Sequence, residues 1–221
     1  MIHEFVKEYF KPGNIYDWGD DPAFFMATKE FSNANFATWG VCRPEVRSQL
    51  KQGDLVIFFC GRQEISREWN YYFIGFGTVQ KTLRERENIW LSDTYKKYRS
   101  FYNLLIRNGQ QFEPFGKLHT DWEKRSLSPY VFFETKEPFT SFNISSPLKV
   151  ATCIPKESLL ERWDSDNSRV KELENILFKK YTQSTRRLRI NNPQRAHVHI
   201  RYKLTISDIN NLRNDLLQFV K

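Results

Sequence analysis

The hydrophobic pattern of the first two thirds of the chain predicts a β-sheet, because its apolar runs have strand length and end at polar turns. The runs lie at residues 23–28, 55–60, 71–80, 130–135 and 148–154. The run at 55–60 is apolar on both faces, which is typical of an internal strand of a closed or doubly covered sheet. Gly75 and Gly77 stand where a small barrel bends, so the pattern favours a small β-barrel.

A short helix is predicted between the first two of these strands. Pro44 suits the first helical position, where a missing N–H costs nothing, and Gly53 suits the left-handed residue just past the helix end. One face of this helix carries the cations Arg43, Arg47 and Lys51. Such a stripe is either a solvated helix face or, beside a helix N-terminus that favours anions, a binding surface for a nucleic-acid backbone.

Three further helices are predicted from residues that recur at steps of three or four. Tyrosines and apolar residues predict a helix over 92–108, which would be an insertion in the barrel. Beyond residue 155, the same spacing predicts amphipathic helices over 170–181 and 209–217.

A β-hairpin is predicted between the two C-terminal helices, because polar and apolar residues alternate strictly at 187–190 and 197–204. A histidine pair on one face of the second strand is a conceivable metal site, but no further ligands stand at suitable spacing, so no metal site is predicted. This face is instead expected to be a partly solvent-exposed basic surface that contacts nucleic acid. The basic surface of the hairpin comprises Arg187, Arg189, His197, His199 and Arg201.

The chain is predicted to have three parts. Residues 1–22 form an arm that packs on the main body, residues 23–154 form the barrel domain, and residues 155–221 form a helix-hairpin-helix extension. The N-terminus carries acids where a signal peptide would be basic and then apolar, and no stretch has membrane-spanning length. We therefore expect a cytoplasmic protein that does not contact a membrane.

Composition indicates a polyanionic partner. The formal net charge is +8, and phosphates neutralised by Lys or Arg release counterions. The chain also has 19 Phe, 10 Tyr and 6 Trp, and aromatic faces beside cations hold unpaired bases, although most of these rings are expected to pack in the core. Three scattered cysteines give no disulfide framework and no zinc motif, so a reducing compartment is expected.

A resemblance to a known family rests on an ordered set of short motifs. These are Ala27-Thr28-Lys29-Glu30, Thr38, Cys42-Arg43-Pro44, Val46-Arg47 and Gly53-Asp54-Leu55-Val56, followed by an apolar strand with glycines at 72–79. The set resembles the nucleotide-modification-associated domains of the PUA-like superfamily, which are relatives of the ASCH, EVE and YTH modules. Trp39-Gly40-Val41 is also similar to the opening of EVE domains, although the segment from Trp39 to Gly53-Asp54 is several residues shorter here.

The resemblance implies an α+β fold, namely a PUA-like (EVE/ASCH-type) small β-barrel with flanking helices, to which the C-terminal helix-hairpin-helix extension predicted from periodicity is added. It also implies a reader of DNA or RNA in which a modified base leaves the stack and enters an aromatic pocket. The predicted pocket comprises Trp39, Thr38, Gly40, Cys42, Trp18 and Trp69. The predicted backbone contacts are Arg43, Arg47 and Lys51, together with the basic surface of the hairpin. The alternative interpretation of each tryptophan is a ring that packs in the core and binds no ligand.

Catalytic motifs do not point to an enzyme. The chain has no Gly-rich phosphate loop, nucleophile elbow or kinase signature, so no catalytic residue and no cofactor is predicted. Two alternatives stay open. One is a small ASCH-like amidohydrolase that acts on modified nucleosides, and the other is an interaction subunit whose C-terminal helices dock on a nuclease or motor protein.

Overall fold

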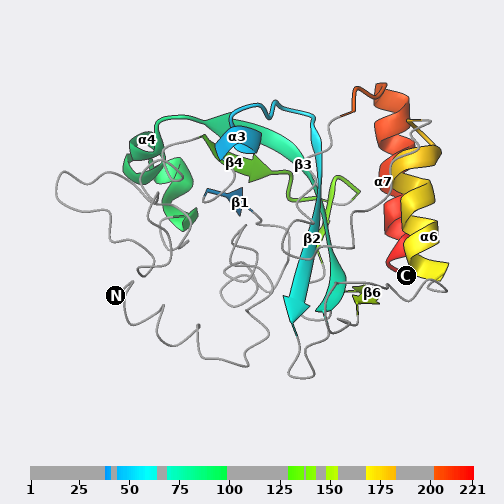
Figure 1. The fold of residues 1–221 in the computed structure, drawn as a ribbon. Coiled ribbons are helices and arrows are strands. Elements are labelled where there is room, and N and C mark those ends of the chain that lie inside the picture. The colour runs from blue at the N-terminus through cyan, green and yellow to red at the C-terminus, as the bar shows by residue number, and fades with distance from the viewer. Residues whose placement is uncertain are drawn as a thin grey trace. The chain divides into compact units, whose positions relative to one another are not determined.

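We describe the protein from a computed structural model (Figure 1). The residues that it describes are 38–40, 44–63, 69–98, 129–136, 138–142, 148–153, 168–182 and 202–221. The chain divides into two compact units. The first comprises Met1–Val56 with Phe76–Ser145, and the second comprises Ile57–Gly75 with Ser146–Lys221. The predicted domain boundaries, after residues 22 and 154, lie outside the described residues.

Six strands form an antiparallel sheet. They are β1 (Thr38–Trp39), β2 (Leu55–Gln63), β3 (Trp69–Leu83), β4 (Tyr130–Phe133), β5 (Thr140–Phe142) and β6 (Leu148–Cys153). β1, β4, β3 and β2 follow one another in hydrogen-bonded order, and β5 and β6 also pair with β3. Within the described part of the chain this order ends at β1 and β2, so the sheet is open.

Helical segments accompany the sheet, which gives the mixed α/β character that the sequence predicts. They are α3 (Pro44–Arg47), α4 (Arg86–Leu91), the 3₁₀ helix η3 (Asp93–Tyr98), α6 (Ser168–Glu174), the π-helical η5 (Asn175–Lys179) and α7 (Ile206–Phe219). None of the helices in the described ranges is both long enough and apolar enough to cross a membrane.

Four of the predicted strands are confirmed as β2, β3, β4 and β6, and β5 was not predicted. The predicted strand at 23–28 lies outside the described residues. Gly53 explains how the chain enters β2, because its φ of 88° is the left-handed conformation that glycine adopts without strain. Its N–H donates to Val79 O at 2.8 Å, and Val79 N–H donates to Asp54 O at 2.8 Å.

The helix that begins at Pro44 is shorter than predicted, because it ends at Arg47 and not near Gly53. After it, Gln49 and Leu50 donate to carbonyls three residues back, and the Asp54 carboxylate accepts from Lys51 N–H at 2.8 Å. These local bonds favour a turn over a further helical turn. Lys51 therefore lies in a turn and does not extend a helical face.

Two other predicted elements are partly corrected. In place of one helix starting at residue 92, α4 ends at Leu91, Ser92 is extended with ψ of 130°, and η3 follows; residues 99–108 lie outside the described ranges. The hairpin segments at 187–190 and 197–201 also lie outside them, while Tyr202 to Leu204 belong to no helix or strand.

In the second unit, α6 and η5 lie beside α7 (Figure 1). The predicted amphipathic pattern is confirmed, because Leu173, Ile176, Leu212 and Leu216 are all buried. Arg169 Nη1 donates to Phe219 O at 2.8 Å, so the start of α6 satisfies a carbonyl at the end of α7. This hydrogen bond joins the start of α6 to the end of α7.

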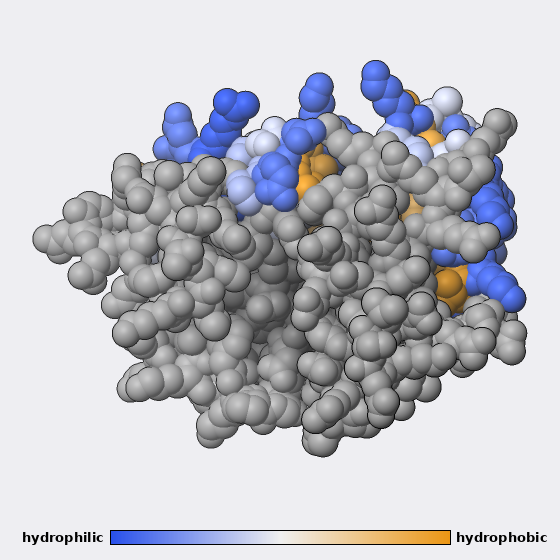
Figure 2. Space-filling view, viewed as in Figure 1, coloured by the Kyte–Doolittle hydropathy of each residue, from blue (hydrophilic) through white to orange (hydrophobic). Residues whose placement is uncertain are grey.

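Large apolar side chains that remain exposed among the described residues are Leu91, Phe139, Tyr202 and Ile206. On the face drawn in Figure 2, the described residues are mostly hydrophilic, and apolar ones occur in small separate patches. Scattered exposed apolar residues of this kind are normal on a protein surface.

Candidate functional site

The predicted pocket residues that the structure describes in the first unit form β1 and the residue after it. Thr38, Trp39 and Gly40 are all buried, and Trp39 is 6% exposed. β1 is held by β4, in a register that pairs Thr38 with Phe132 and Trp39 with Val131. These three predicted pocket residues are therefore buried, and two of them form a strand.

A buried hydrogen bond ties β1 to β4. The hydroxyl groups of Thr38 and Tyr130 lie 2.8 Å apart, and Tyr130 is fully buried. Burial raises the pKa of Tyr130, because a phenolate would lose its hydration; the Thr38 hydroxyl and the positive charges of Arg86 and Arg47 oppose this shift without overcoming it. The Tyr130 hydroxyl thus stays protonated at neutral pH and can both donate and accept a hydrogen bond.

Two buried guanidinium groups adjoin this hydrogen bond. Arg86, 3% exposed at the start of α4, donates from Nη2 to Gly40 O and lies 5.6 Å from the centroid of the Tyr130 ring. Arg47 in α3 is 0% exposed and donates from Nη1 to Pro129 O at 2.7 Å. Each arginine thereby ties a short helix to the chain next to the sheet. We call Thr38, Trp39, Gly40, Arg47, Arg86 and Tyr130 the β1 cluster.

The buried position of Arg47 corrects the predicted stripe of three cations. Lys51 is exposed, Arg47 is not, and Arg43 lies outside the described residues. A guanidinium without solvent exposure cannot line an open surface for phosphates in this conformation. Its cost of desolvation is instead offset by hydrogen bonds such as that to Pro129 O.

Of the other predicted pocket residues, the described ranges include Trp69. Trp69 is the first residue of β3, which begins two residues before the predicted strand, and it pairs with Cys153 in the second unit. The remaining predicted residues lie outside the described ranges, and they are Trp18, Cys42, Arg43, Arg187, Arg189, His197, His199 and Arg201.

Sequence reasoning missed Arg86 and Tyr130 as members of the cluster. Arg86 follows Arg84 and Glu85 in a charged run, which is typical of a solvated segment. Tyr130 opens an apolar strand and reads as a core ring. The one available signal was that a tyrosine in a fully buried strand needs a hydrogen-bond partner for its hydroxyl.

The β1 cluster offers hydrogen-bond donors around an aromatic ring, but it offers no group for acid–base catalysis at neutral pH. Its titratable side chains are two arginines and a tyrosine whose pKa is raised. Within the described residues, no three His, Cys, Asp or Glu side chains gather where they could hold a metal ion.

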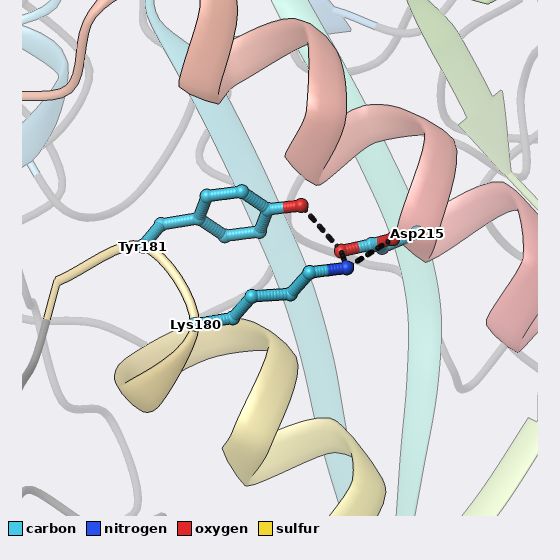
Figure 3. Close-up of polar contacts among 3 residues, drawn as sticks. All are labelled: Lys180, Tyr181 and Asp215. Atoms are coloured by element: carbon cyan, nitrogen blue, oxygen red, sulfur yellow. Dashed lines mark hydrogen bonds and ion pairs between the residues drawn. The ribbon is translucent and has the colours of Figure 1, made fainter.

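A second polar cluster lies in the second unit, where Figure 3 shows Lys180 and Tyr181 pointing at Asp215 of α7. Lys180 Nζ lies 2.9 and 2.7 Å from the two carboxylate oxygens, and the Tyr181 hydroxyl donates to Oδ2 at 2.5 Å. The hydrogen bond to Asp215 raises the pKa of Lys180, and burial, followed by the bond to Asp215, raises the pKa of Tyr181. A lysine that is kept protonated is not a nucleophile. The hydrogen bonds of Lys180 and Tyr181 to Asp215 link the segment after η5 to α7.

Comparison with known protein families, curated proteins and solved structures finds no match to this chain.

Proposed function

We propose that the protein is a nucleic-acid reader that accommodates a flipped, modified base against Trp39. The setting of Trp39 in the β1 cluster is the observation that carries this proposal. Its two neighbours along the chain make the Thr38–Tyr130 and Arg86–Gly40 hydrogen bonds. A site that identifies an extruded base needs an aromatic ring for stacking and hydrogen-bond groups for the base edge. The net charge of +8 supports a polyanionic partner.

The fold that we propose for this function is a PUA-like barrel with flanking helices. The described strands would make up most of the barrel, together with the predicted strand at residues 23–28. The extension would consist of α6 with η5, the predicted hairpin and α7. The ordered motifs from residue 27 to residue 79 support this part of the proposal.

A base can reach Trp39 only if the site opens, because the indole is 6% exposed. Extruding a base costs a few kcal/mol, and least when the base is unpaired. Stacking contributes about 1 to 3 kcal/mol per base, so stacking with pocket hydrogen bonds can offset the extrusion. The same burial also fits a core ring, so the test must separate lost binding from lost folding.

Backbone contacts would come from exposed cations around the site. Among the cations predicted to contact phosphate, Lys51 is within the described residues and is exposed in the turn before β2. The other candidates are Arg43 and the basic surface of the hairpin, which lie outside the described residues. Arg47 would act from inside by fixing α3, and not by touching phosphate.

The test is fluorescence anisotropy with short DNA and RNA oligonucleotides that carry different modified bases or none. We expect Trp39→Phe to reduce the preference for the recognised modified base about fivefold or more, since part of the stacking surface is lost. Trp90→Phe is the matched control, because Trp90 is a partly exposed tryptophan of α4 in the same unit, and it should bind like the unchanged protein. Lys51→Ala should shallow the salt dependence by about one phosphate contact.

Thermal unfolding of each variant accompanies the binding measurement. A Trp39→Phe protein that unfolds like the unchanged protein but loses its preference supports the proposal. A protein that binds no oligonucleotide in the panel, or a Trp39→Phe variant whose preference is unchanged, contradicts it.

A further inference from the structure

β1 is a short strand at one end of the hydrogen-bonded order of the sheet (Figure 1). It consists of Thr38 and Trp39, and within the described part of the chain it pairs with β4. β4 in turn pairs with β3 in a register that extends from Val79 to Leu83. A strand at the end of a sheet can separate from its neighbour while the other strand pairs stay intact, and such a local opening costs less free energy than global unfolding.

Side-chain hydrogen bonds hold β1 and the residue that follows it. The hydroxyl groups of Thr38 and Tyr130 lie 2.8 Å apart, and Arg86 Nη2 donates to Gly40 O. Tyr130 belongs to β4 and Arg86 to α4, so these bonds join residues 38–40 to two different elements. Both bonds must break when residues 38–40 move away from β4 and α4. Each bond therefore favours the closed position of residues 38–40.

These bonds lie apart from the Trp39 ring. Consecutive residues of a strand point to opposite faces of a sheet, so the Thr38 hydroxyl and the indole are on different faces. The register agrees with this, because Thr38 is opposite Phe132 and Trp39 is opposite Val131. The bond of Gly40 uses a backbone carbonyl. The attachment of β1 can therefore be changed at Thr38 without removing a side chain from the face of the indole.

In the closed position, residues 38–40 hide the proposed base site. Trp39 is 6% exposed, Thr38 is 1% exposed, and Gly40 is buried. A ring with so little exposure presents no free face on which a base could stack. If a ligand binds only the open state, the measured dissociation constant is that of the open state divided by the fraction of molecules that are open. Hydrogen bonds that favour the closed position therefore weaken binding.

We propose that residues 38–40 form a gate that must separate from β4 before Trp39 can stack on a base. The Thr38–Tyr130 and Arg86–Gly40 hydrogen bonds keep this gate closed in the free protein. Thr38, Tyr130 and Arg86 are then positioning residues, which act through the position of Trp39. A base that stacks on Trp39 binds the open state and shifts the population towards it. This inference rests on the proposed function, because it describes how the same site is regulated.

The first experiment measures hydrogen–deuterium exchange of the full chain by mass spectrometry, in the absence of nucleic acid. Tyr130→Phe and Thr38→Val each remove the hydroxyl bond and nearly keep the shape of the side chain. Each should speed exchange at residues 38–40 about fivefold, as expected when one buried hydrogen bond is lost. Exchange at residues 73–79 of β3, which are all buried, should stay unchanged in both variants.

Thr78→Val is the matched control for Thr38→Val. It removes the bond from Thr78 Oγ1 to Phe139 O, 2.7 Å long, and Thr78 is also a buried threonine of the first unit. It should leave exchange at residues 38–40 unchanged.

Further variants keep the test decisive. The double variant of Thr38→Val and Tyr130→Phe should exchange at 38–40 no faster than the faster single variant, because the same bond can be lost only once. Arg86→Met removes the donor to Gly40 O and should also speed exchange at 38–40. Should Thr38→Val or Arg86→Met not fold, Tyr130→Phe still decides the outcome.

The second experiment repeats the anisotropy measurements with the same panel of oligonucleotides. Tyr130→Phe should bind the recognised oligonucleotide about fivefold more tightly than the unchanged protein, by the same factor as its exchange accelerates. Thr78→Val should bind like the unchanged protein. A hydroxyl bond that only stabilises the fold would give the opposite result for Tyr130→Phe, namely equal or weaker binding.

The results separate the gate from the reader. Faster exchange confined to residues 38–40, together with tighter binding, supports the gate. If the protein reads a modified base but Tyr130→Phe changes neither exchange at 38–40 nor affinity, speeds exchange at 73–79 equally, or binds more weakly, the gate is refuted and the reader stands. If Tyr130→Phe binds more tightly while Trp39→Phe keeps its base preference, opening controls binding but reading by Trp39 is refuted. If no oligonucleotide binds, the gate and the reader are both refuted, whatever the exchange at residues 38–40.

Discussion

Arg47 is fully buried in α3, where its Nη1 donates to Pro129 O at 2.7 Å. Arg47→Met retains much of the apolar volume but removes the donor and leaves the Pro129 carbonyl without this bond. We expect the free energy of unfolding to fall by about 2 to 3 kcal/mol, which is typical when a buried hydrogen bond to a charged group is lost. Urea unfolding measures this change.

Lys51→Met is the matched control for Arg47→Met, since both cations belong to the same predicted stripe and Lys51 is exposed. A surface change of this kind should alter the free energy of unfolding by less than about 0.5 kcal/mol. Equal stability of the two variants would show that the hydrogen bond from Arg47 to Pro129 O does not stabilise the folded protein.

The spacing of Arg43, Arg47 and Lys51 shows how far reasoning from single residues reaches. Steps of four residues place side chains on one helical face if the helix continues, but they do not reveal which face a strand covers. The burial of Arg47 depends on Pro129, which is far away in sequence. Thr38, Trp39 and Gly40 were chosen from a local motif, whereas their neighbours Arg86 and Tyr130 are set by tertiary pairing.

Among the elements, α7 has the most complete local signal. Thr205 Oγ1 accepts from Asp208 N–H at 3.1 Å, while the Asp208 carboxylate accepts from Thr205 N–H at 3.4 Å, which together form a capping box. We expect Thr205→Ala to lower the free energy of unfolding by about 1 kcal/mol. Urea unfolding followed by far-ultraviolet circular dichroism checks this value.

Ser207→Ala serves as the comparison for Thr205→Ala, because Ser207 is an exposed hydroxyl residue in the first turn of the same helix. It should leave stability within about 0.5 kcal/mol of the unchanged protein. A loss for Ser207→Ala as large as that for Thr205→Ala would mean that the box does not stabilise α7.

Elements with strong local patterns could be predicted from the sequence. Elements whose length depends on competition between helical and side-chain hydrogen bonds could not. Periodicity located β2, β3, β4, β6 and the two C-terminal helices. Pro44 begins α3 as predicted, but the side chain of Asp54 holds Lys51 in a turn, and so the left-handed Gly53 closes that turn and not the helix. β5 has only three residues, too few for a pattern to identify it.

At the scale of the whole molecule, buried tyrosines are expected to make the protein less stable at alkaline pH. Tyr98 is 7% exposed, and burial raises its pKa from 10.0 to about 12; burial also raises the pKa of Tyr130. An acid whose pKa is higher in the folded protein than in the unfolded chain favours folding while it is neutral. Its contribution is therefore complete below pH 10 and is lost as the pH rises towards 12, because the unfolded chain releases the proton first.

The urea midpoint should accordingly change little through Tyr98 between pH 7 and 9 and fall between pH 10 and 12. One such group contributes a slope of up to about 1.4 kcal/mol per pH unit. Tyr98→Phe removes the ionisable hydroxyl but keeps the ring against Phe132, 4.9 Å away between centroids, so its midpoint should fall less steeply in this range. Parallel curves for the two proteins above pH 10 would show that the Tyr98 hydroxyl ionises as readily in the folded protein as in the unfolded chain. The hydroxyl would then not be held in a desolvated interior beside the β1 cluster.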